Sequence, residues 1–362
     1  MRSNTFILNQ DVSTINLLLL AFSFLLGLSV LTIDQFVLGV SPLAEGPPIF
    51  DNIYLLRTAL ITLSSGLFVY AVIQLRQPKI NPFTQESEFK VWGIQGHMAV
   101  WAIQLCALTF LFIFLASPEL FYQLGSEDNP IEILSATLCF LNFGIFVYIS
   151  YLIYQYINHS KIHYLLISLG FAAAFFLIGM EEISWFQRAL SIETPEIFKG
   201  NIQNEMNLHN FATNKVENAY YLSAFTVLIL FPFIYDKLFI NKQKDLFSFY
   251  LPSRFIRFSS AIFVAYNYDM WNILFTQLSF FMTLFILMHY AYSYVRIDFN
   301  IIVVLSVIAV FILTQVLFIF FGGNFIRAWD VTEYKELFIP LAYLLYSIEV
   351  LQRAKHLNTR TK

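Results

Sequence analysis

The chain has 362 residues, of which 58% are hydrophobic and only 12% are charged, and its formal net charge is −3. A soluble domain carries roughly 25% charged residues, so this composition excludes an ordinary soluble protein and indicates an integral membrane protein. The sequence contains neither a basic segment suited to nucleic acid nor a glycine-rich phosphate loop. We therefore expect no nucleic-acid partner and a function in or at the membrane.

Apolar runs of about 20 residues, the length that crosses a bilayer core, recur along the chain. They lie at 15–40, 54–75, 95–117, 131–157, 162–185, 217–235, 272–294, 300–321 and 336–352. A tenth run, 255–266, is short, so it either spans the membrane or is re-entrant. The first run is too long for the apolar part of a signal peptide, and we expect it to be retained as a span.

The distribution of basic residues distinguishes a count of ten spans from a count of nine, because short cytoplasmic loops are enriched in Lys and Arg. With ten spans and a cytoplasmic N-terminus, 15 of the 21 basic residues lie inside, whereas omission of the short span lowers that number to 12. We predict an all-α, polytopic helical integral membrane protein of about ten transmembrane helices, or nine if 255–266 is re-entrant. Residues 1–362 form one transmembrane domain with both termini cytoplasmic, and the expected location is a bacterial inner membrane.

This topology places 17 of the 24 acidic residues at or near the outer face. The first acidic cluster is "GSEDNPIEIL", which contains Glu127, Asp128 and Glu132 at the start of the fourth span. Asp128 or Asn129 as the N-cap, with Pro130 at the first helical position, is typical of a helix start, where acidic side chains interact favourably with the helix dipole. These three acids are candidates for binding a substrate, and the alternative is helix-start chemistry in a solvated loop.

The second cluster is "GMEEISWFQR", at the end of the fifth span. If the helix continues, Glu181, Trp185 and Arg188 share one face and Glu182 is turned by about 100°. Ionisable groups at the edge of a span are costly unless they face a cavity or a partner. Glu181 and Glu182 are candidate catalytic residues, and Trp185, Gln187 and Arg188 are candidates for substrate binding. Arg188 would suit an anionic group such as a lipid phosphate, and the alternative is a solvated helix end with an interfacial Trp.

Residues 186–216 are expected to form a capping loop with short helices over the outer mouth. If 201–210 is helical, Glu205 and His209 stand at i and i+4 and can point to one spot. Crowded carboxylates at a low-dielectric boundary exchange protons readily, so His209 joins the two glutamates as a candidate for acid-base catalysis. Asn207, in the same amide-rich stretch, is a candidate for substrate binding.

Glu205 and His209 are also two potential metal ligands of a kind that Zn²⁺, Mn²⁺ or iron accepts. The sequence has no HExxH motif, no EF-hand and no cluster of histidines. A divalent metal is therefore an alternative that the residues do not favour, and a hydrogen-bonded Glu–His pair is the simpler interpretation. The sequence specifies no cofactor.

The segments "EEISWFQR", "ETPE" and "NIQNEMNLHN", between Glu181 and Asn210, resemble a signature of bacterial multi-pass membrane proteins that have no established activity. In those proteins the residue after the Trp is often Gly, where this chain has Phe186. The resemblance covers under a sixth of the chain, with "EDNPIE" as weaker support. It implies a shared site without naming its chemistry.

Three classes of function remain open. The leading hypothesis is an intramembrane or interfacial enzyme that acts on a lipid-linked or glycan substrate through Glu181, Glu182 and His209. The alternatives are a structural or assembly subunit of a membrane complex and a cation or solute transporter. A transporter would show helix breaks near the bilayer midplane and repeated halves, and the sequence shows neither clearly. Membrane lipids are the expected partners, a lipid or glycan is a possible substrate, and the sequence does not identify any protein partner.

Overall fold

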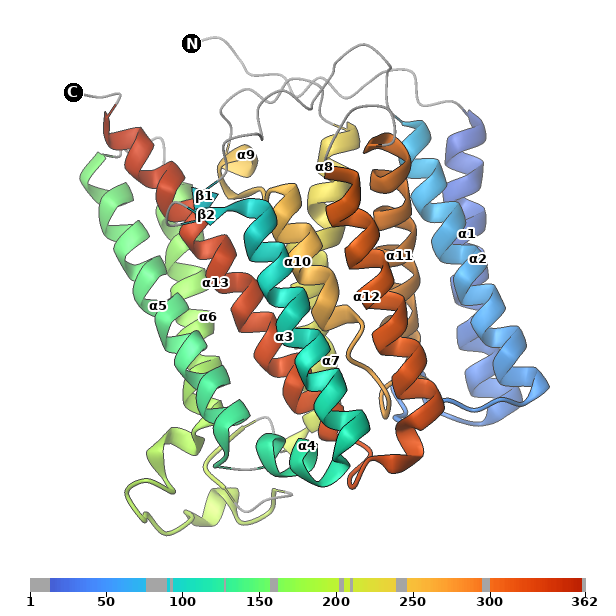
Figure 1. Ribbon diagram of the computed structural model, residues 1–362, viewed down its shortest axis with the longest axis horizontal. Helices are drawn as coiled ribbons and strands as arrows, with labels where there is room; N and C mark the ends of the chain where they lie inside the picture. The colour runs from blue at the N-terminus through green and yellow to red at the C-terminus, as the bar shows by residue number, and fades with distance from the viewer. Residues whose placement is uncertain are drawn as a thin grey trace.

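The computed structural model describes residues 14–75, 90–91, 94–126, 128–156, 162–201, 205–208, 211–238, 246–294 and 300–359. These residues form a bundle of long helices (Figure 1). The strands within these ranges are β1 (Lys90–Val91) and β2 (Ile94–Gln95), which pair antiparallel. The prediction of an all-α polytopic membrane protein is confirmed.

Nine helices in the described ranges are long and apolar enough to cross a membrane. They are α1 (Thr14–Thr32, continued by the π-helix η1, Ile33–Leu38), α2 (Asn52–Gln74), α3 (Gly96–Ala116), α5 (Pro130–Tyr156), α6 (Ile162–Glu182), α7 (Thr213–Phe225, continued through η7, Thr226–Leu230, into α8, Phe231–Leu238), α11 (Leu274–Tyr294), α12 (Asn300–Phe321) and α13 (Asp330–Thr359). The shorter elements are α4 (Pro118–Gly125), α9 (Leu246–Tyr250), α10 (Arg254–Val264) and the 3-10 turns η4 (Ser184–Phe186), η5 (Glu196–Phe198) and η8 (Gly322–Asn324).

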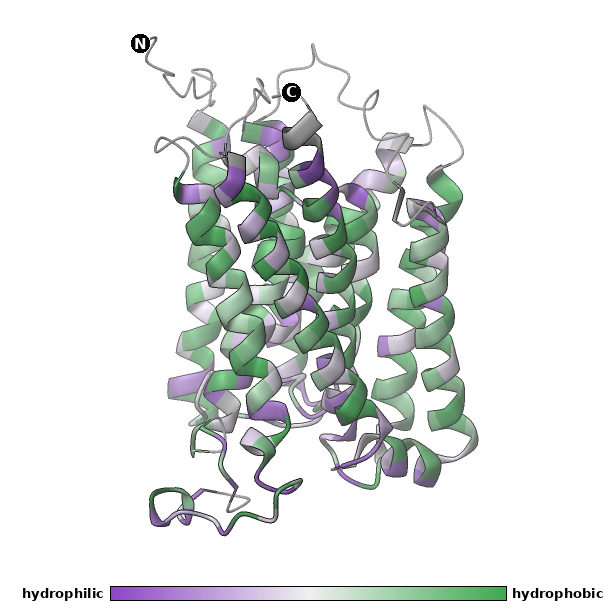
Figure 2. Cartoon of the chain, turned by 90° about the vertical axis from the view of Figure 1, so that its left-hand side faces the viewer, coloured by the Kyte–Doolittle hydropathy of each residue, from purple (hydrophilic) through white to green (hydrophobic). Residues whose placement is uncertain are grey.

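Hydrophobic residues make up most of the length of the helices, and hydrophilic residues gather toward the two ends of the bundle (Figure 2). This pattern is the one expected of helices that face lipid. α1 begins and α13 ends at the same end of the bundle (Figure 1). We call the opposite end, where the loop between α6 and α7 lies, the cap end.

α13 is the most deeply buried of the nine long helices. Two tyrosines on it, Tyr334 and Tyr346, are fully buried and donate their hydroxyls to the carbonyl oxygens of Phe121 (2.6 Å) and Tyr250 (2.7 Å). A buried hydroxyl without a partner would cost free energy in a medium that offers no water. These bonds therefore fix α13 between α4 and α9 while keeping its polar atoms satisfied.

α1 and α2 form a hairpin at the edge of the bundle, joined by a buried ion pair. Arg57 of α2 donates from Nε and Nη2 to the two carboxylate oxygens of Asp34, at 2.5 and 2.8 Å. The two side chains are 2% and 0% exposed. Ser23 and Ser64 add a reciprocal pair of hydrogen bonds in which each hydroxyl donates to the other residue's carbonyl at 2.8 Å. Such contacts let two apolar helices approach closely.

The short apolar run predicted at 255–266 does cross the bundle, but only part of it is helical. α10 has 11 residues, which gives a length of about 16 Å. Ahead of it, the Ser253 N–H donates to Glu349, near the end of α13. Beyond it, the carbonyl of Asp269 accepts from the N–H of Gly46, in the loop between α1 and α2 at the cap end. Within the described residues the chain therefore crosses the bundle ten times with nine long helices, and 255–266 is not re-entrant.

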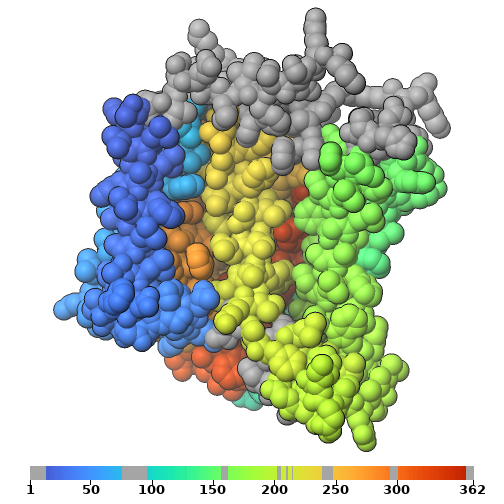
Figure 3. All heavy atoms as spheres, turned by 180° about the vertical axis from the view of Figure 1, so that it is seen from behind, coloured from blue at the N-terminus to red at the C-terminus, as the bar shows by residue number. Residues whose placement is uncertain are grey.

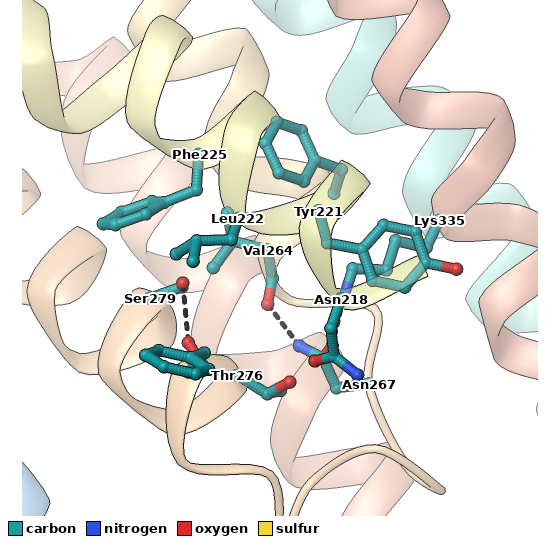
Figure 4. Close-up of a pocket in the computed structure, with 11 residues that line it drawn as sticks. Asn218, Tyr221, Leu222, Phe225, Val264, Asn267, Thr276, Ser279 and Lys335 are labelled. Atoms are coloured by element: carbon teal, nitrogen blue, oxygen red, sulfur yellow. Dashed lines mark hydrogen bonds between the residues drawn. The ribbon is translucent and has the colours of Figure 1, made fainter. Parts of the chain in front are cut away.

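Side chains from later helices form hydrogen bonds at the break in the helix after α10. Irregular backbone at membrane depth is tolerated only where it is buried in protein or lines a cavity. Asn267 donates to the carbonyl of Val264 at the end of α10 and accepts from the Lys335 ammonium of α13 (Figure 4). Gln315 of α12 donates to the Asn267 carbonyl at 2.8 Å. The carbonyl of Asp269 then accepts from the N–H of Gly46, and the N–H groups of Asn272 and Leu274 donate to the carbonyls of Gly46 and Pro42 in the loop between α1 and α2.

Candidate functional site

The cap end contains a cavity of about 580 Å³ between α6, α7 and α13. Its wall is dominated by carboxylates, and we call it the acidic cavity. The acidic residues that line it are Glu45, Glu132, Glu181, Glu182, Glu205, Glu217, Asp269, Glu333 and Glu336. Arg188 and Arg327 are its two arginines, and the remaining wall is polar, aromatic or apolar.

The chain leaves α6 through a strained turn, and the expectation that this helix continues to Arg188 is wrong. α6 ends at Glu182, and Ser184, Trp185 and Phe186 then have φ values of 46°, 53° and 61°. Left-handed backbone costs about 1–2 kcal/mol per non-glycine residue, so the surrounding contacts must hold this turn in place. The turn redirects the chain into the loop that covers the cavity.

Glu181 is one of the contacts that hold the turn. Its Oε1 accepts from the Trp185 indole N–H at 2.7 Å, and its Oε2 accepts from the backbone N–H of Leu208 at 2.5 Å. The first bond ties Glu181 to the strained turn and the second ties it to the far part of the loop. Both carboxylate oxygens of Glu181 are therefore engaged in positioning the loop.

Gln187 makes a second connection across the same loop. Its side-chain carbonyl accepts from the Met206 N–H at 2.5 Å, and its amide donates to the Thr194 hydroxyl at 2.7 Å. Gln187 is buried, so a change to an apolar residue would leave two backbone or hydroxyl groups without these partners. Its surroundings indicate a structural role in the loop.

Arg188 is surrounded by three carboxylates. Its guanidinium lies 2.6 Å from Glu132, 3.3 Å from Asp128 and 3.4 Å from Glu205. Burial lowers the pKa of Arg188, but the nearby carboxylates, Glu132 first, outweigh burial and raise this pKa. The sequence prediction brought these four residues to one site, and the structure does place them together. The charge of Arg188 is compensated by the protein's own acids, which disfavours a role in holding a phosphate.

Glu205 sits in a tight turn rather than on a helix. The Asn201 amide donates to the Glu205 carbonyl at 2.6 Å and to the Asn207 carbonyl at 3.2 Å. The Glu205 carboxylate accepts from the Ser184 hydroxyl and from the Asn207 amide. Residues 205–208 are not helical, so the helix on which the i, i+4 alignment of Glu205 depended is not formed there. Its predicted partner His209, and Glu127 in the first cluster, lie outside the described residues.

Three carboxylates in the acidic cavity contrast with these paired ones. Glu182 at the end of α6, Glu217 of α7 and Glu333 of α13 line the cavity. Within the described ranges none of the three forms a hydrogen bond or an ion pair. Glu336, one turn after Glu333, instead accepts from the Tyr221 hydroxyl at 2.7 Å. Sequence reasoning selected Glu182 but not Glu217 or Glu333, although both lie at the edges of predicted spans, as Glu182 does.

Asp269 contributes a buried carboxylate from the turn after the broken crossing. It is 6% exposed, and its Oδ1 has no hydrogen-bond partner among the described residues. Burial, and to a smaller extent Glu45, raise the pKa of Asp269 to about 7 against the opposing charge of Lys335. Asp269 is thus a group that can exchange a proton near neutral pH.

The carboxylates of the acidic cavity are spread around its wall. Within the part of the chain that the structure describes, no three His, Cys, Asp or Glu side chains lie close enough together to hold a metal ion. The metal site considered for Glu205 and His209 remains a prediction, because His209 falls outside that part.

No family model, curated protein or solved structure matches this chain. Its class is therefore defined by its own fold and site. It is a polytopic α-helical membrane protein whose described residues cross the bundle ten times, once through a broken helix, with an acidic cavity covered by a loop that begins at a strained turn.

Proposed function

We propose that the protein is a membrane enzyme that acts by carboxylate acid-base catalysis on a lipid-linked or glycan substrate in the acidic cavity. The observation that carries the proposal is that Glu182, Glu217 and Glu333, from three different helices, face one cavity without partners among the described residues. Carboxylates in unequal environments supply the general acid and the general base of one reaction. In a purely structural cluster the acids would instead be paired with basic groups, as the three carboxylates around Arg188 are.

The proposal divides the residues of the site into two groups. Glu182, Glu217 and Glu333 are the candidate acids and bases, and His209 stays a candidate outside the described residues. Glu181, by contrast, is a positioning residue, because its two oxygens hold Trp185 and Leu208.

A lipid-linked substrate also has a route to the cavity. The space-filling view shows a cleft between α6 and α7–α8, green and yellow in Figure 3, with α13 visible at its floor. The acidic cavity lies where α6 and α7 reach the cap end, and Leu177 and Val216 line its wall. A head group in the cavity can thus stay attached to a chain in the bilayer.

The test uses purified protein incubated with bacterial lipid extracts and lipid-linked glycans, with products followed by mass spectrometry. We expect time-dependent conversion of one species by the wild type and a loss of at least 100-fold in Glu182→Gln, since general acid-base catalysis typically contributes about 10²–10⁴-fold. Glu193→Gln removes the same charge at an exposed position of the loop and should leave conversion unchanged. Full turnover by Glu182→Gln, Glu217→Gln and Glu333→Gln would refute the proposal.

A transporter is the second candidate, and the broken crossing favours it. Discontinuous helices with buried polar side chains line the substrate paths of many transporters, and Asn267, Gln315 and Lys335 surround such a break here. Counterflow in proteoliposomes tests this candidate. Accumulation of a labelled solute that Gln315→Leu abolishes would favour transport over catalysis.

We also propose that the cap end faces outward from a bacterial inner membrane, with both termini cytoplasmic. The support is the excess of Lys and Arg on the opposite side. Fusion of alkaline phosphatase and of green fluorescent protein after residue 362 tests the orientation. Fluorescence without phosphatase activity is expected, and the reverse pattern would overturn the assignment.

A further inference from the structure

We propose that the acidic cavity binds an organic cation, namely the ammonium group of a lipid-anchored amine whose apolar chain lies in the cleft between α6 and α7. The inference deepens the proposed function and rests on it, because it names the chemical class of the substrate for the same cavity.

The charge balance of the cavity is the first reason. Arg188 is matched by Glu132 and Glu205, and Arg327 is paired with Asp330 at 2.8 Å. The acids of the wall that have no ion pair among the described residues are Glu45, Glu182, Glu217, Asp269 and Glu333. A concave site lined by one sign of charge between low-dielectric walls attracts the opposite sign. A phosphate or carboxylate head group would be repelled.

Asp269 gives a second, independent reason. Its side chain is 6% exposed, it lines the cavity, and its Oδ1 has no hydrogen-bond partner in the described structure. A buried acceptor left unsatisfied costs free energy, and a charged one costs more than a neutral one. The ammonium of Lys335 is committed to Asn267 and lies 4.1 Å from the centroid of the Tyr221 ring. A donor from a ligand would remove the cost at Asp269.

The spacing of the acids distinguishes an organic cation from a metal ion. A divalent metal needs ligands that converge to about 2.0–2.6 Å from one point, and the described acids do not gather in this way. An ammonium group makes separate N–H bonds of about 2.7–2.9 Å, and it is held equally well by an aromatic face. Tyr220 and Trp329 supply such faces in the wall of the cavity.

The apolar part of the ligand has a place beside the acids. On α6, which runs toward the cap end, Leu177 and Ile178 come before the glutamates, and on α7, which runs away from it, Tyr220 comes after Glu217. The two helices that carry these residues flank the cleft that Figure 3 shows. An apolar chain in this cleft and an ammonium group at Glu182 and Glu217 would match the change in polarity along both helices.

The experiment measures binding of tritiated dodecylamine to the full-length protein in neutral-lipid nanodiscs. We expect saturable binding that unlabelled dodecylamine displaces and that neither dodecanol nor dodecyl phosphate displaces. Glu217→Gln, Glu333→Gln and Asp269→Asn should each weaken binding at least tenfold, and the exposed control Glu193→Gln should not. Thermal unfolding of each variant verifies that it is folded, and binding is compared among the folded variants.

The chain in the cleft is tested separately. Leu177→Trp adds bulk on α6 five residues before Glu182 and should weaken binding of dodecylamine at least fivefold while leaving displacement by butylamine unchanged. Leu105→Trp, on the exposed surface of α3, is the matched control. Equal competition by dodecyl phosphate, or wild-type affinity in all three carboxylate variants, would overturn the inference.

These outcomes separate the inference from the proposed function, because binding is measured without turnover. Selective amine binding without any conversion would leave the inference standing and remove the enzyme. Conversion of a substrate that carries no amine would support the enzyme and remove the inference of an amine ligand.

Discussion

Replacement of Arg188 by Gln should destabilise the cap end, because it leaves Asp128, Glu132 and Glu205 close together without a counter-charge. An exposed ion pair contributes at most about 1 kcal/mol, and loss of one partner of a buried pair costs about 3–5 kcal/mol. The Arg188 and Glu132 side chains are 23% and 14% exposed, so this site lies between the two limits. We expect Arg188→Gln to lower the free energy of unfolding by roughly 2–3 kcal/mol.

Thermal and denaturant unfolding in detergent, followed by tryptophan fluorescence, measures this loss. Lys199→Gln is the matched control, because it removes the same charge from the exposed pair with Glu196 and should change stability by less than about 0.5 kcal/mol. The double variant Arg188→Gln/Glu132→Gln should recover part of the loss, since one uncompensated charge is gone. A single variant as stable as the control, or a double variant less stable than the single one, would refute the reasoning.

Three further predictions concern stability. Arg57→Leu should lower the free energy of unfolding by about 3–5 kcal/mol because it leaves Asp34 buried and unpaired, and Asp34→Leu/Arg57→Leu should lower it much less. A double-mutant cycle measures the coupling between the two side chains. A double variant as unstable as the single one would contradict the prediction. Gly322→Ala places a Cβ 1.9 Å from a tyrosine ring atom and should cost roughly 1–3 kcal/mol by overpacking. Gly323→Ala has open space, so equal melting temperatures for the two would disprove the clash. The pKa of Asp269, raised from 3.8 to about 7, should make the free energy of unfolding fall as pH rises between these values, because the unfolded state releases its proton first. Asp269→Asn should flatten this part of the pH profile, and an unchanged slope would exclude Asp269 as its source.

Hydropathy was enough to predict the nine long helices, because each must bury about 20 consecutive apolar residues whatever its neighbours are. The same spans also predicted that Glu181, Arg188 and Glu205 lie at one end of the bundle. Their roles could not be predicted in the same way. Glu181 lies on α6, yet the carboxylate is engaged by the strained turn and by Leu208, 27 residues along the chain.

The turn itself had no local signal, because its three left-handed residues are Ser184, Trp185 and Phe186 rather than glycines. Glu217 and Glu333 were missed for a related reason. They come from α7 and α13, and only the packing of α13 through the centre of the bundle brings them into one cavity. A sequence without aligned relatives contains no signal for such long-range convergence.

The broken crossing has a consequence for how the protein is made. α10 is about half the length that a helix needs to cross a bilayer, and Arg254 and Arg257 lie in its first turn. The groups that satisfy its end, Gln315 and Lys335, are synthesised 48 and 68 residues after Asn267. The crossing should therefore stay outside the lipid core until α12 and α13 have entered. Truncation of the chain before α12 should leave 254–273 accessible to modification on the side opposite the cap end, which makes assembly of the acidic cavity one of the last steps of membrane insertion.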